Sequence, residues 1–396
     1  MQSLHIVTDL DNSFGGPAKS VPSLCNALKG QDIDVALFSA NMRSEESNEF
    51  VDRYKLQWRS EKAILGNRFG YSSKLYNRIS KNISSDTVIH NQSLWTYPVY
   101  CGFRAARAKK VPLIVSPRST LYRKSLENSS SIKKAARVLF VDRMLECASC
   151  IHATHTDELE QIRELGIKTP IAIIRNGIDT TEFLNLKNKA AAREEFGFKA
   201  DERICLFLSR INKRKRLEEL IMAFNVLADK YKKWSLLIAG PMDHDYDKEV
   251  IGPLIDSLPD NIAEKIRFAG NLSGPHRLNA FAAADLFVLP TKFENFGMAI
   301  GEAMAAGLPV ITTNGTPWTM LDEIGAGSCI DAGLDGFREV LNEYFGKNAD
   351  QLDAMGRIGN KHIIENYSWD NIAIDFKSLY SWVLGKGDKP EFVHTY

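Results

Sequence analysis

Apolar and polar residues follow one another along this chain in a regular succession of short and long segments. Short runs of β-branched and other apolar residues recur, and each is followed by a stretch whose apolar residues have helical spacing. Loops rich in Gly, Pro, Asn or Asp separate these segments, which is typical of strands that alternate with helices in a parallel sheet. We expect strands at residues 4–8, 33–39, 87–90, 112–116, 150–154, 171–175, 204–209, 235–240, 266–270, 286–290, 309–312 and 328–330.

The succession is interrupted between Arg175 and Arg203, where a polar, alanine-rich segment follows the sequence Asn-Gly-Ile-Asp. We therefore predict two doubly wound α/β domains, residues 1–185 and 186–368. The last helix, from residue 369, has an apolar stripe that could dock on either domain, and we assign residues 369–396 to the first. Ligands of such sheets bind beyond the carboxyl ends of the strands, so we expect the site in a cleft between the domains.

Composition is that of an ordinary globular protein. The chain has 396 residues, 44% hydrophobic and 25% charged, which excludes a disordered chain and a small disulfide-stapled fold. We expect neither a signal peptide nor a membrane-spanning helix, because no basic leader and no run of about 18 apolar residues is present. Six cysteines in so long a chain favour a reducing, cytoplasmic compartment.

Charge is distributed unevenly although the net charge is only +1. Residues 1–185 carry 25 basic and 19 acidic side chains, and the remainder carries 25 and 30, which gives +6 and −5. Between Cys101 and Arg143 there are eleven Lys or Arg against two acidic residues. This excess indicates either an anionic partner or a solvated pair of helices.

Two segments have the composition of phosphate-binding loops. Gly15 and Gly16 follow the first strand and open a helix, so bare backbone N–H groups there either approach a phosphate or form a tight turn. Residues 210–216 follow the strand at 204–209 and hold five cations in seven residues. That segment is either a diphosphate site or a solvated basic turn.

A third segment, Glu294-Asn295-Phe296-Gly297-Met298-Ala299-Ile300-Gly301-Glu302, follows a strand and enters a helix. Its two carboxylates are eight residues apart, and Gly297 exposes amides near the helix start. Helix capping explains only the first carboxylate, whereas binding of neighbouring sugar hydroxyls explains both.

Metal binding is not expected. Cys147, Cys150, His152 and His155 have a spacing similar to that of zinc ligands, but the same residues fit a helix end followed by a strand. Acidic groups at 9–11, 32–34 and 243–247 are interpreted as solvated turns or caps rather than Mg²⁺ sites.

Together these segments resemble family 4 of the retaining nucleotide-sugar glycosyltransferases. The specific part is Glu294 to Glu302, which is similar to the family's E-x7-E motif, and residues 282–290 and 302–311 also follow the family pattern. The resemblance implies the GT-B architecture, two Rossmann-like domains that face each other across a cleft. It extends over nearly the whole chain.

The resemblance also implies roles for individual residues. Arg210 and Lys215 would hold the donor diphosphate, Glu294 the sugar hydroxyls and Glu302 the ribose hydroxyls. The remaining donor-binding positions would be Gly15, Gly16, Asn295, Phe296, Gly297 and Met298. The donor would be a UDP- or GDP-sugar, and no cofactor or metal is expected.

Two positions depart from the family pattern. Many members have a histidine where this chain reads Ser116-Pro117-Arg118, and residues 316–318 replace a Gly-Gly-x-Pro-Glu loop. His90 or Arg118 could take the role of the histidine on the acceptor side, and the sequence leaves both open. Similar variants occur in transferases of bacterial surface polysaccharides, of O-antigen or capsule type.

We therefore expect a retaining glycosyltransferase that acts on a saccharide or a polyprenyl-pyrophosphate-linked glycan, peripherally at the inner face of the cytoplasmic membrane. The basic excess at 101–143 would attract the lipid pyrophosphate or the anionic membrane. The alternative is a GT-B-like protein that binds nucleotide sugar or glycan without transferring it. A nucleic-acid partner is not expected.

Overall fold

The computed structural model describes residues 1–10, 16–41, 48–63, 69–118, 120–123, 126, 135–331 and 333–396. Within these ranges the chain forms two compact units: Met1–Gly177 together with Trp369–Tyr396, and Ile178–Ser368. The sequence-based boundary, after residue 185, lies a few residues later than this one.

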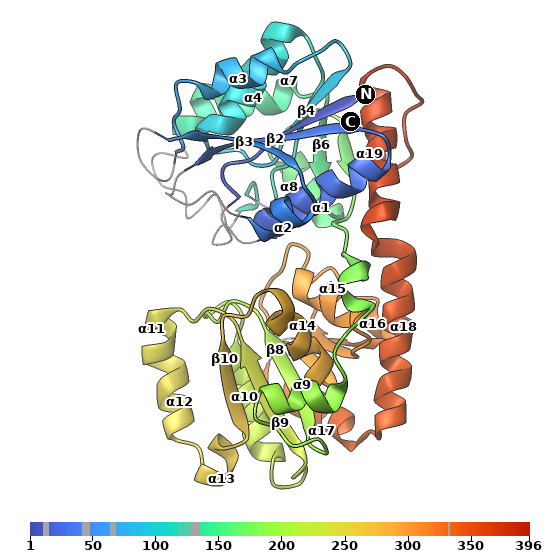
Figure 1. The fold of residues 1–396 in the computed structure, drawn as a ribbon. Coiled ribbons are helices and arrows are strands. Elements are labelled where there is room, and N and C mark those ends of the chain that lie inside the picture. The colour runs from blue at the N-terminus through green and yellow to red at the C-terminus, as the bar shows by residue number, and fades with distance from the viewer. Residues whose placement is uncertain are drawn as a thin grey trace. The chain divides into compact units, whose positions relative to one another are not determined.

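The first unit is built on an eight-stranded sheet in the order β14-β7-β6-β5-β4-β1-β2-β3 (Figure 1). All pairs are parallel except β14 with β7. The chain runs outward from the centre in both directions, so the switch point of this sheet lies between β1 and β4. The strands are β1 (Gln2–Ile6), β2 (Asp34–Asn41), β3 (Gln57–Lys62), β4 (Thr87–Asn91), β5 (Leu113–Val115), β6 (Cys150–Ala153), β7 (Ile171–Ile173) and β14 (Val393–His394).

Helices cover both faces of this sheet, and each face has its own hydrophobic cluster. Phe38 and Ile89 point into one cluster, while their neighbours Leu37 and Val88 point into the other, as the alternation along a strand requires. The helices are α1 (Gly16–Gly30), α2 (Glu49–Arg53), α3 (Leu75–Lys81), α4 (Tyr97–Lys109), the π-helical turn η2 (Arg137–Val141), α7 (Asp142–Cys147), α8 (Thr156–Glu164) and α19 (Trp369–Val383).

The helix α19 packs beside α1 and brings the end of the chain back to the first unit. Phe376, Leu379 and Tyr380 of α19 are buried in the cluster that also contains Val21 and Leu28 of α1. The apolar stripe of this helix could have docked on either domain, and in the structure it docks on the first unit.

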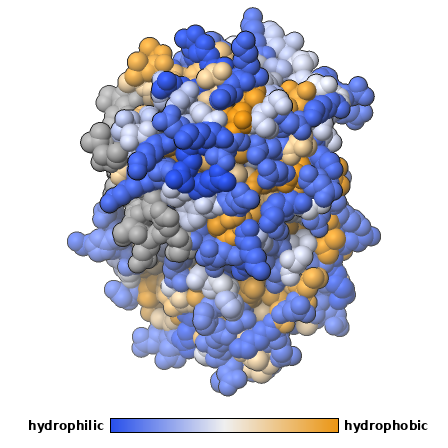
Figure 2. All heavy atoms as spheres, turned by 45° about the horizontal axis from the view of Figure 1, so that its top comes forward, coloured by the Kyte–Doolittle hydropathy of each residue, from blue (hydrophilic) through white to orange (hydrophobic). Residues whose placement is uncertain are grey.

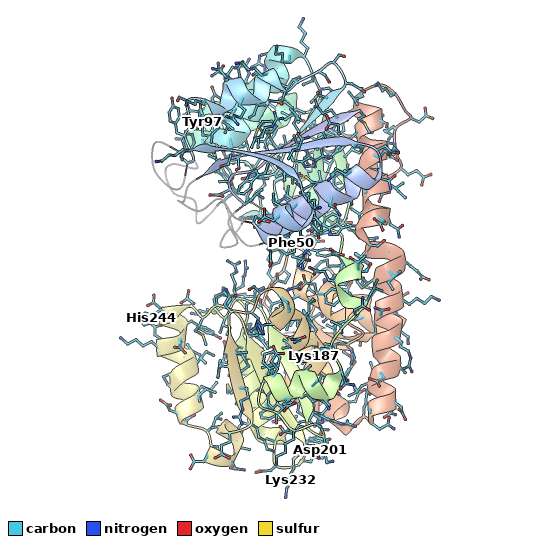
Figure 3. All side chains as sticks on the ribbon, in the orientation of Figure 1. Phe50, Tyr97, Lys187, Asp201, Lys232 and His244 are labelled. Atoms are coloured by element: carbon cyan, nitrogen blue, oxygen red, sulfur yellow. The ribbon has the colours of Figure 1, made fainter. Side chains whose placement is uncertain are left out.

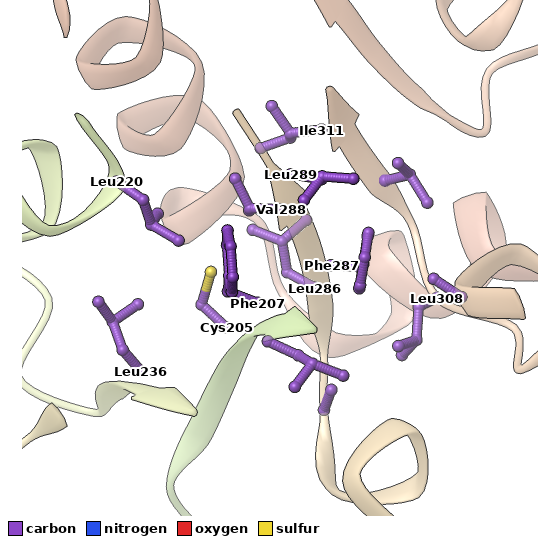
Figure 4. Packing of buried hydrophobic residues seen from close by; sticks show 14 of the residues in the cluster. Cys205, Phe207, Leu220, Leu236, Leu286, Phe287, Val288, Leu289, Leu308 and Ile311 are labelled. Carbon is purple, nitrogen blue, oxygen red and sulfur yellow. The ribbon is translucent and has the colours of Figure 1, made fainter. Parts of the chain in front are cut away.

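The second unit contains a six-stranded parallel sheet in the order β10-β9-β8-β11-β12-β13, whose switch point lies between β8 and β11. Phe207, Phe287 and Leu289 of the central strands are buried and pack with Leu220 in one core (Figure 4). The strands are β8 (Arg203–Leu208), β9 (Trp234–Ala239), β10 (Ile266–Gly270), β11 (Leu286–Leu289), β12 (Val310–Thr313) and β13 (Gly327–Ile330).

Helical segments flank this second sheet. They are η3 (Thr180–Phe183), α9 (Lys189–Glu195), α10 (Leu217–Leu227), α11 (His244–Tyr246), η4 (Asp247–Ile251), α12 (Gly252–Asp256), α13 (Asp260–Ala263), α14 (Gly274–Ala283), α15 (Met298–Ala305), α16 (Leu321–Ile324), α17 (Leu334–Gly346) and α18 (Ala349–Tyr367). Both units thus have the predicted doubly wound α/β class. No helix in the described ranges is long and apolar enough to cross a membrane.

Two strands, β3 and β14, are missing from the sequence-based expectation. Both lie at the edges of the first sheet, and β3 reads Gln-Trp-Arg-Ser-Glu-Lys without an apolar run. Edge strands need no continuous apolar sequence, because a neighbouring strand supports them on one side only. The expected strands inside both sheets are present, with ends shifted by one or two residues.

Candidate active site

The switch point of the second sheet brings two predicted segments together. The loop of residues 209–216 follows β8, and the loop of residues 290–297 follows β11, the neighbouring strand. The backbone N–H of Lys292 donates to the carbonyl of Arg214 at 2.8 Å, which ties the two loops to each other. Parallel neighbours on opposite sides of a switch point leave a crevice for ligand, so this is the candidate site.

Lys215 and Glu294 form an ion pair in this crevice. Only 6% of the Lys215 side chain and 13% of the Glu294 side chain is exposed. Burial lowers the pKa of Lys215, and the adjacent Glu294 carboxylate opposes that shift. Thr291 donates its hydroxyl to Glu294 Oε1 at 3.0 Å and helps to hold the carboxylate. Two groups predicted from different loops are therefore in direct contact.

Lys215 retains hydrogen-bonding capacity beyond this pair. An ammonium group has three protons, and in the described part of the chain Nζ donates only to Glu294. A buried donor that lacks an acceptor is unfavourable, so the site favours an additional anionic acceptor next to Lys215. Arg210, five residues earlier, is exposed near the start of the same loop.

The start of α15 supplies backbone amides. Gly297 precedes the helix with a left-handed φ of 75°, a conformation that favours glycine. Phe296 is buried and accepts a hydrogen bond from Trp318 Nε1 at its carbonyl, whereas Asn295 and Met298 are half-buried. The helix N-terminus thus lies beside the Lys215–Glu294 pair, with its dipole suited to an anion.

Glu302 is held by a partner that the sequence analysis missed. Arg277 donates to Glu302 at 2.7 Å and to Glu182 at 2.6 Å, and all three side chains are largely buried. A guanidinium between two carboxylates fixes their orientation. Glu182 and Arg277 belong to η3 and α14, far apart in sequence, and no local motif marks either residue.

The predicted residues of the first unit are near the switch point of its own sheet. Gly16 is exposed and opens α1, while Gly15 lies outside the described residues. His90 ends up inside the sheet with no exposed surface, and Arg118 lies just beyond β5.

His90 belongs to a buried chain of hydrogen bonds. His152 Nε2 donates to the carbonyl of Ile174 at 2.8 Å, so its Nδ1 accepts from Ser116 at 2.7 Å. Ser116 then accepts from His90 Nε2 at 2.7 Å, and His90 Nδ1 accepts from the hydroxyl of Tyr380 at 2.8 Å. Both rings are neutral in this arrangement. Burial lowers the pKa of His152 to about 3 and that of His90 well below its ordinary value.

Part of the basic excess lines a surface groove of about 430 Å³. Arg104, Arg107 and Arg143 are exposed there, and none of them pairs with a carboxylate among the described residues. We call this the arginine groove; its lining residues are Tyr76, Tyr100, Phe103, Arg104, Arg107, Ala108, Leu139, Phe140 and Arg143.

Two apolar side chains of η2 adjoin the arginine groove. Leu139, which lines the groove, is 77% exposed, and the preceding residue, Val138, is 85% exposed. The molecule otherwise presents hydrophobic patches separated by a mainly hydrophilic surface on the face turned to the viewer in Figure 2. These exposed apolar side chains lie beside cations, of which Arg104 and Arg107 stack over the rings of Tyr76 and Phe103.

The residues considered as metal ligands have other partners. His155 lies 3.0 Å from the Tyr122 hydroxyl, and His152 belongs to the hydrogen-bond chain described above. Asp243 caps α11, whose first residue, His244, is labelled in Figure 3. In the described ranges there is no group of three or more His, Cys, Asp or Glu that could hold a metal ion.

Family models match both units. The model "Glycosyltransferase Family 4" matches residues 14–182, and the model "Glycosyl transferases group 1" matches residues 188–330. An uncharacterized glycosyltransferase of Methanocaldococcus jannaschii, MJ1607, is 26% identical over 92% of this chain and 94% of its own length. The D-inositol 3-phosphate glycosyltransferase of Streptomyces scabiei is 26% identical over 71% of this chain and 65% of its own length.

Solved structures share the fold. Sucrose-phosphate synthase from Thermosynechococcus elongatus has a TM-score of 0.72 at 18% identity and covers 97% of this chain and all of its own. Anabaena Alr3699/HepE in complex with UDP-glucose has a TM-score of 0.74 at 17% identity and covers 96% of this chain and all of its own. WaaG, a glycosyltransferase involved in lipopolysaccharide biosynthesis, has a TM-score of 0.70 at 14% identity and covers 95% of this chain and 99% of its own.

The two parallel α/β units have the GT-B fold of these structures, and the family models identify the chain as a glycosyltransferase. The matches over both units specify the class further. The chain belongs to the GT4-like glycosyltransferases. The expected fold and family are thereby confirmed.

Proposed function

We propose that this protein is a retaining, metal-independent hexosyltransferase. It would move a sugar from a UDP- or GDP-sugar to a saccharide or lipid-linked oligosaccharide in surface-polysaccharide synthesis. The main support is the buried Lys215–Glu294 pair at the switch point, with protons of Lys215 still available. Three structural neighbours are complexes of Alr3699/HepE with UDP, with UDP and glucose, or with UDP-glucose, which agrees with such a donor.

The donor diphosphate would lie between Lys215, Arg210 and the first amides of α15. Lys215 binds a phosphate oxygen with the protons that Glu294 does not use, while Arg210 adds a second charge from the exposed part of the loop. Glu294 would accept hydroxyls of the sugar. Glu302, held in place by Arg277, would accept hydroxyls of the ribose.

Transfer would proceed on one face of the sugar without a covalent enzyme intermediate. A double displacement needs a nucleophile below the anomeric carbon, and both Glu294 and Glu302 are assigned to hydroxyls. The bond from the anomeric carbon to the diphosphate breaks, the bond to the acceptor oxygen forms, and the departing diphosphate takes the acceptor proton. Arg210, Lys215 and the α15 N-terminus stabilise the developing negative charge, so a divalent metal is not required.

The acceptor side would be supplied by the first unit. The arginine groove and the exposed Val138 and Leu139 support peripheral attachment to an anionic membrane surface, where a lipid-linked acceptor is found. This attachment needs no membrane-spanning segment.

Product analysis tests the proposal. Purified protein is incubated in excess EDTA with UDP- and GDP-sugars and a panel of saccharides, free and linked to polyprenyl diphosphate. We expect turnover equal to that without EDTA and a product with the donor's anomeric configuration, read from the anomeric proton coupling by NMR. An inverted product would contradict retention, and a strict metal requirement would contradict the role given to the cations. Donor binding without transfer to any acceptor would favour the non-catalytic alternative.

A further inference from the structure

Arg118 lies where three segments of the first unit converge. It follows β5, Gln92 follows β4, and Ser20 belongs to the first turns of α1, which comes after β1. Arg118 donates to Gln92 Oε1 from Nη2 at 2.6 Å and from Nε at 3.2 Å, and Nη1 donates to Ser20 Oγ at 3.3 Å. Because β1 and β4 flank the switch point of this sheet, the guanidinium group lies at the position where such sheets bind ligands.

The guanidinium group is held in place from both sides. Gln92 is 2% exposed, and its Nε2 donates to His5 Nδ1 at 3.0 Å, so Oε1 is turned toward Arg118. His5 is fully buried, and burial lowers its pKa to about 3, which keeps it neutral as an acceptor. Arg118 itself has a left-handed φ of 53°, a backbone conformation that is unfavourable for a non-glycine residue. The chain therefore maintains a strained backbone that directs this cation to the switch point.

The charge of Arg118 is not balanced by a bonded carboxylate. None of the described residues forms an ion pair with it, and its hydrogen bonds to Gln92 and Ser20 use three of five guanidinium protons. Burial lowers the pKa of Arg118 to about 10, so the group is charged at neutral pH. Glu158 attracts it from a distance, but the Glu158 carboxylate is buried and accepts bonds from Thr154. A partly buried guanidinium with donors to spare favours a bound anion.

His90, the other candidate for this role, has no access to a ligand. It has no exposed surface, and its two ring nitrogens bond to Tyr380 and Ser116. Arg118 is only partly buried and presents donors rather than an imidazole. The acceptor-side group of this chain is therefore the cation.

We infer that Arg118 binds a phosphate group of the acceptor, so that the acceptor is a phosphate or diphosphate ester rather than a neutral sugar. This inference rests on the proposed transferase function. The flat guanidinium fork suits two phosphate oxygens at once, and the neutral histidines around it add no competing charge. The phosphate could belong to a sugar phosphate or to a lipid diphosphate.

Calorimetric titration of the full-length protein tests the inference. Inorganic pyrophosphate is titrated after the donor site has been saturated with whichever of UDP and GDP binds. We expect wild type to bind one pyrophosphate and Arg118→Gln to bind it at least tenfold more weakly, while Arg118→Lys, which keeps charge without the fork, is intermediate. The control is Arg123→Gln, which removes an exposed cation five residues away and should bind like wild type.

Each outcome has a defined meaning. Equal pyrophosphate affinity in wild type and Arg118→Gln, or no second anion site in wild type, overturns the inference. Nucleotide affinity in Arg118→Gln should equal that of wild type, which shows that the donor site of the second unit is intact. If no nucleotide binds to wild type, the proposed donor site fails instead, and pyrophosphate is titrated alone. Farnesyl diphosphate binding more tightly than pyrophosphate supports a lipid-linked acceptor, and glucose 6-phosphate binding more tightly supports a free sugar phosphate.

Discussion

Lys215 shows how a single residue acquires its chemistry from burial. Its neighbours Lys213 and Arg214 are exposed, whereas Lys215 is turned inward against Glu294, where burial lowers its pKa and the carboxylate opposes that shift. An exposed lysine satisfies its protons with water, but one in this crevice depends on the groups that the protein or a ligand supplies. A lysine is therefore solvated at position 213, whereas at position 215 it depends on Glu294 and on a ligand for its hydrogen bonds.

Lys215→Ala should weaken binding of the nucleoside diphosphate by about 1.5–3 kcal/mol, or roughly 10- to 100-fold, because a charge-assisted bond to phosphate is lost. Isothermal titration with UDP and GDP measures the effect. Lys213→Ala serves as the control, because it removes the same charge from the exposed part of the same loop. Unchanged affinity in Lys215→Ala would move the phosphate site elsewhere.

Glu294→Ala should have the opposite profile. We expect nucleoside diphosphate affinity to change little, because the carboxylate is assigned to the sugar and not to the phosphate. Turnover should fall by about 100-fold or more, as expected when an oriented group that contacts the reacting sugar is removed. Steady-state kinetics and the same titrations separate the two effects. A loss confined to nucleotide binding, with turnover at saturation intact, would reverse the roles assigned to Glu294 and Lys215.

At the scale of elements, the histidine chain joins the last helix to the first sheet. Tyr380 of α19 donates to His90 of β4, and the chain continues through Ser116 to His152 of β6. Every nitrogen of these two rings has a defined partner in the neutral state. A proton added to either ring would remove the nitrogen that accepts the proton of the Tyr380 or Ser116 hydroxyl, so acid should weaken the docking of α19.

The free energy of unfolding of the first unit should fall as the pH drops below about 6.5. His5, His90 and His152 have lowered pKa values in the folded state, so below that pH the unfolded chain binds more protons than the folded one. Each histidine contributes a loss of about 1.4 kcal/mol per pH unit. Urea unfolding of the full chain between pH 7.5 and 5.5 measures how steeply the free energy of unfolding depends on pH.

Single-histidine variants show which histidines cause this slope of the free energy of unfolding against pH. His90→Gln should reduce it by about a third, since one of three neutral rings is gone. His244→Gln, which alters an exposed histidine of the second unit, should leave it unchanged. A slope that is the same in His90→Gln and in wild type would assign the pH dependence to other groups.

The arginine groove is the second feature at this scale, because α3, α4, η2 and α7 form it together. Replacing Arg104, Arg107 and Arg143 by Gln should weaken binding to vesicles with phosphatidylglycerol by about 1 kcal/mol per charge, roughly 100-fold in total. Vesicle co-sedimentation at low salt measures this. The matched control is Lys230, Lys232 and Lys233 to Gln, the same charge change on the second unit. Equal losses in both triple variants would indicate a nonspecific charge effect, and no binding by wild type would exclude the membrane surface.

At the scale of the whole molecule, each unit repeats one principle. Both sheets reverse their strand order once. In the second unit the predicted binding residues follow the strands beside that reversal, and in the first unit Arg118 follows β5 and bonds to Gln92, which follows β4 at the reversal. The second unit carries a paired cation and carboxylate there. The first carries a guanidinium that forms no ion pair with any residue that the structure describes. The difference matches the assignment of the sugar donor to one unit and of a phosphorylated acceptor to the other.

The sequence by itself determined the elements and the loops that carry the chemistry. Most strands inside the two sheets are short segments rich in apolar residues, and the binding loops have distinctive composition, because local propensity and burial on both faces constrain each position. The segments around Arg210, Lys215 and Glu294 were therefore recognisable without a structure. The polar edge strands β3 and β14 were not, because little apolar surface is required of an edge.

The tertiary structure decided the partners, because they come from segments that are distant along the chain. Arg277 reaches Glu302 from α14, Tyr380 reaches His90 across 290 residues, and Gln92 holds Arg118 from the neighbouring strand. No local pattern encodes such pairs, which exist only once the strand order places their elements together. The same assembly leaves His90 without exposed surface and Arg118 partly exposed, since exposure is a property of the assembled sheet and not of either residue.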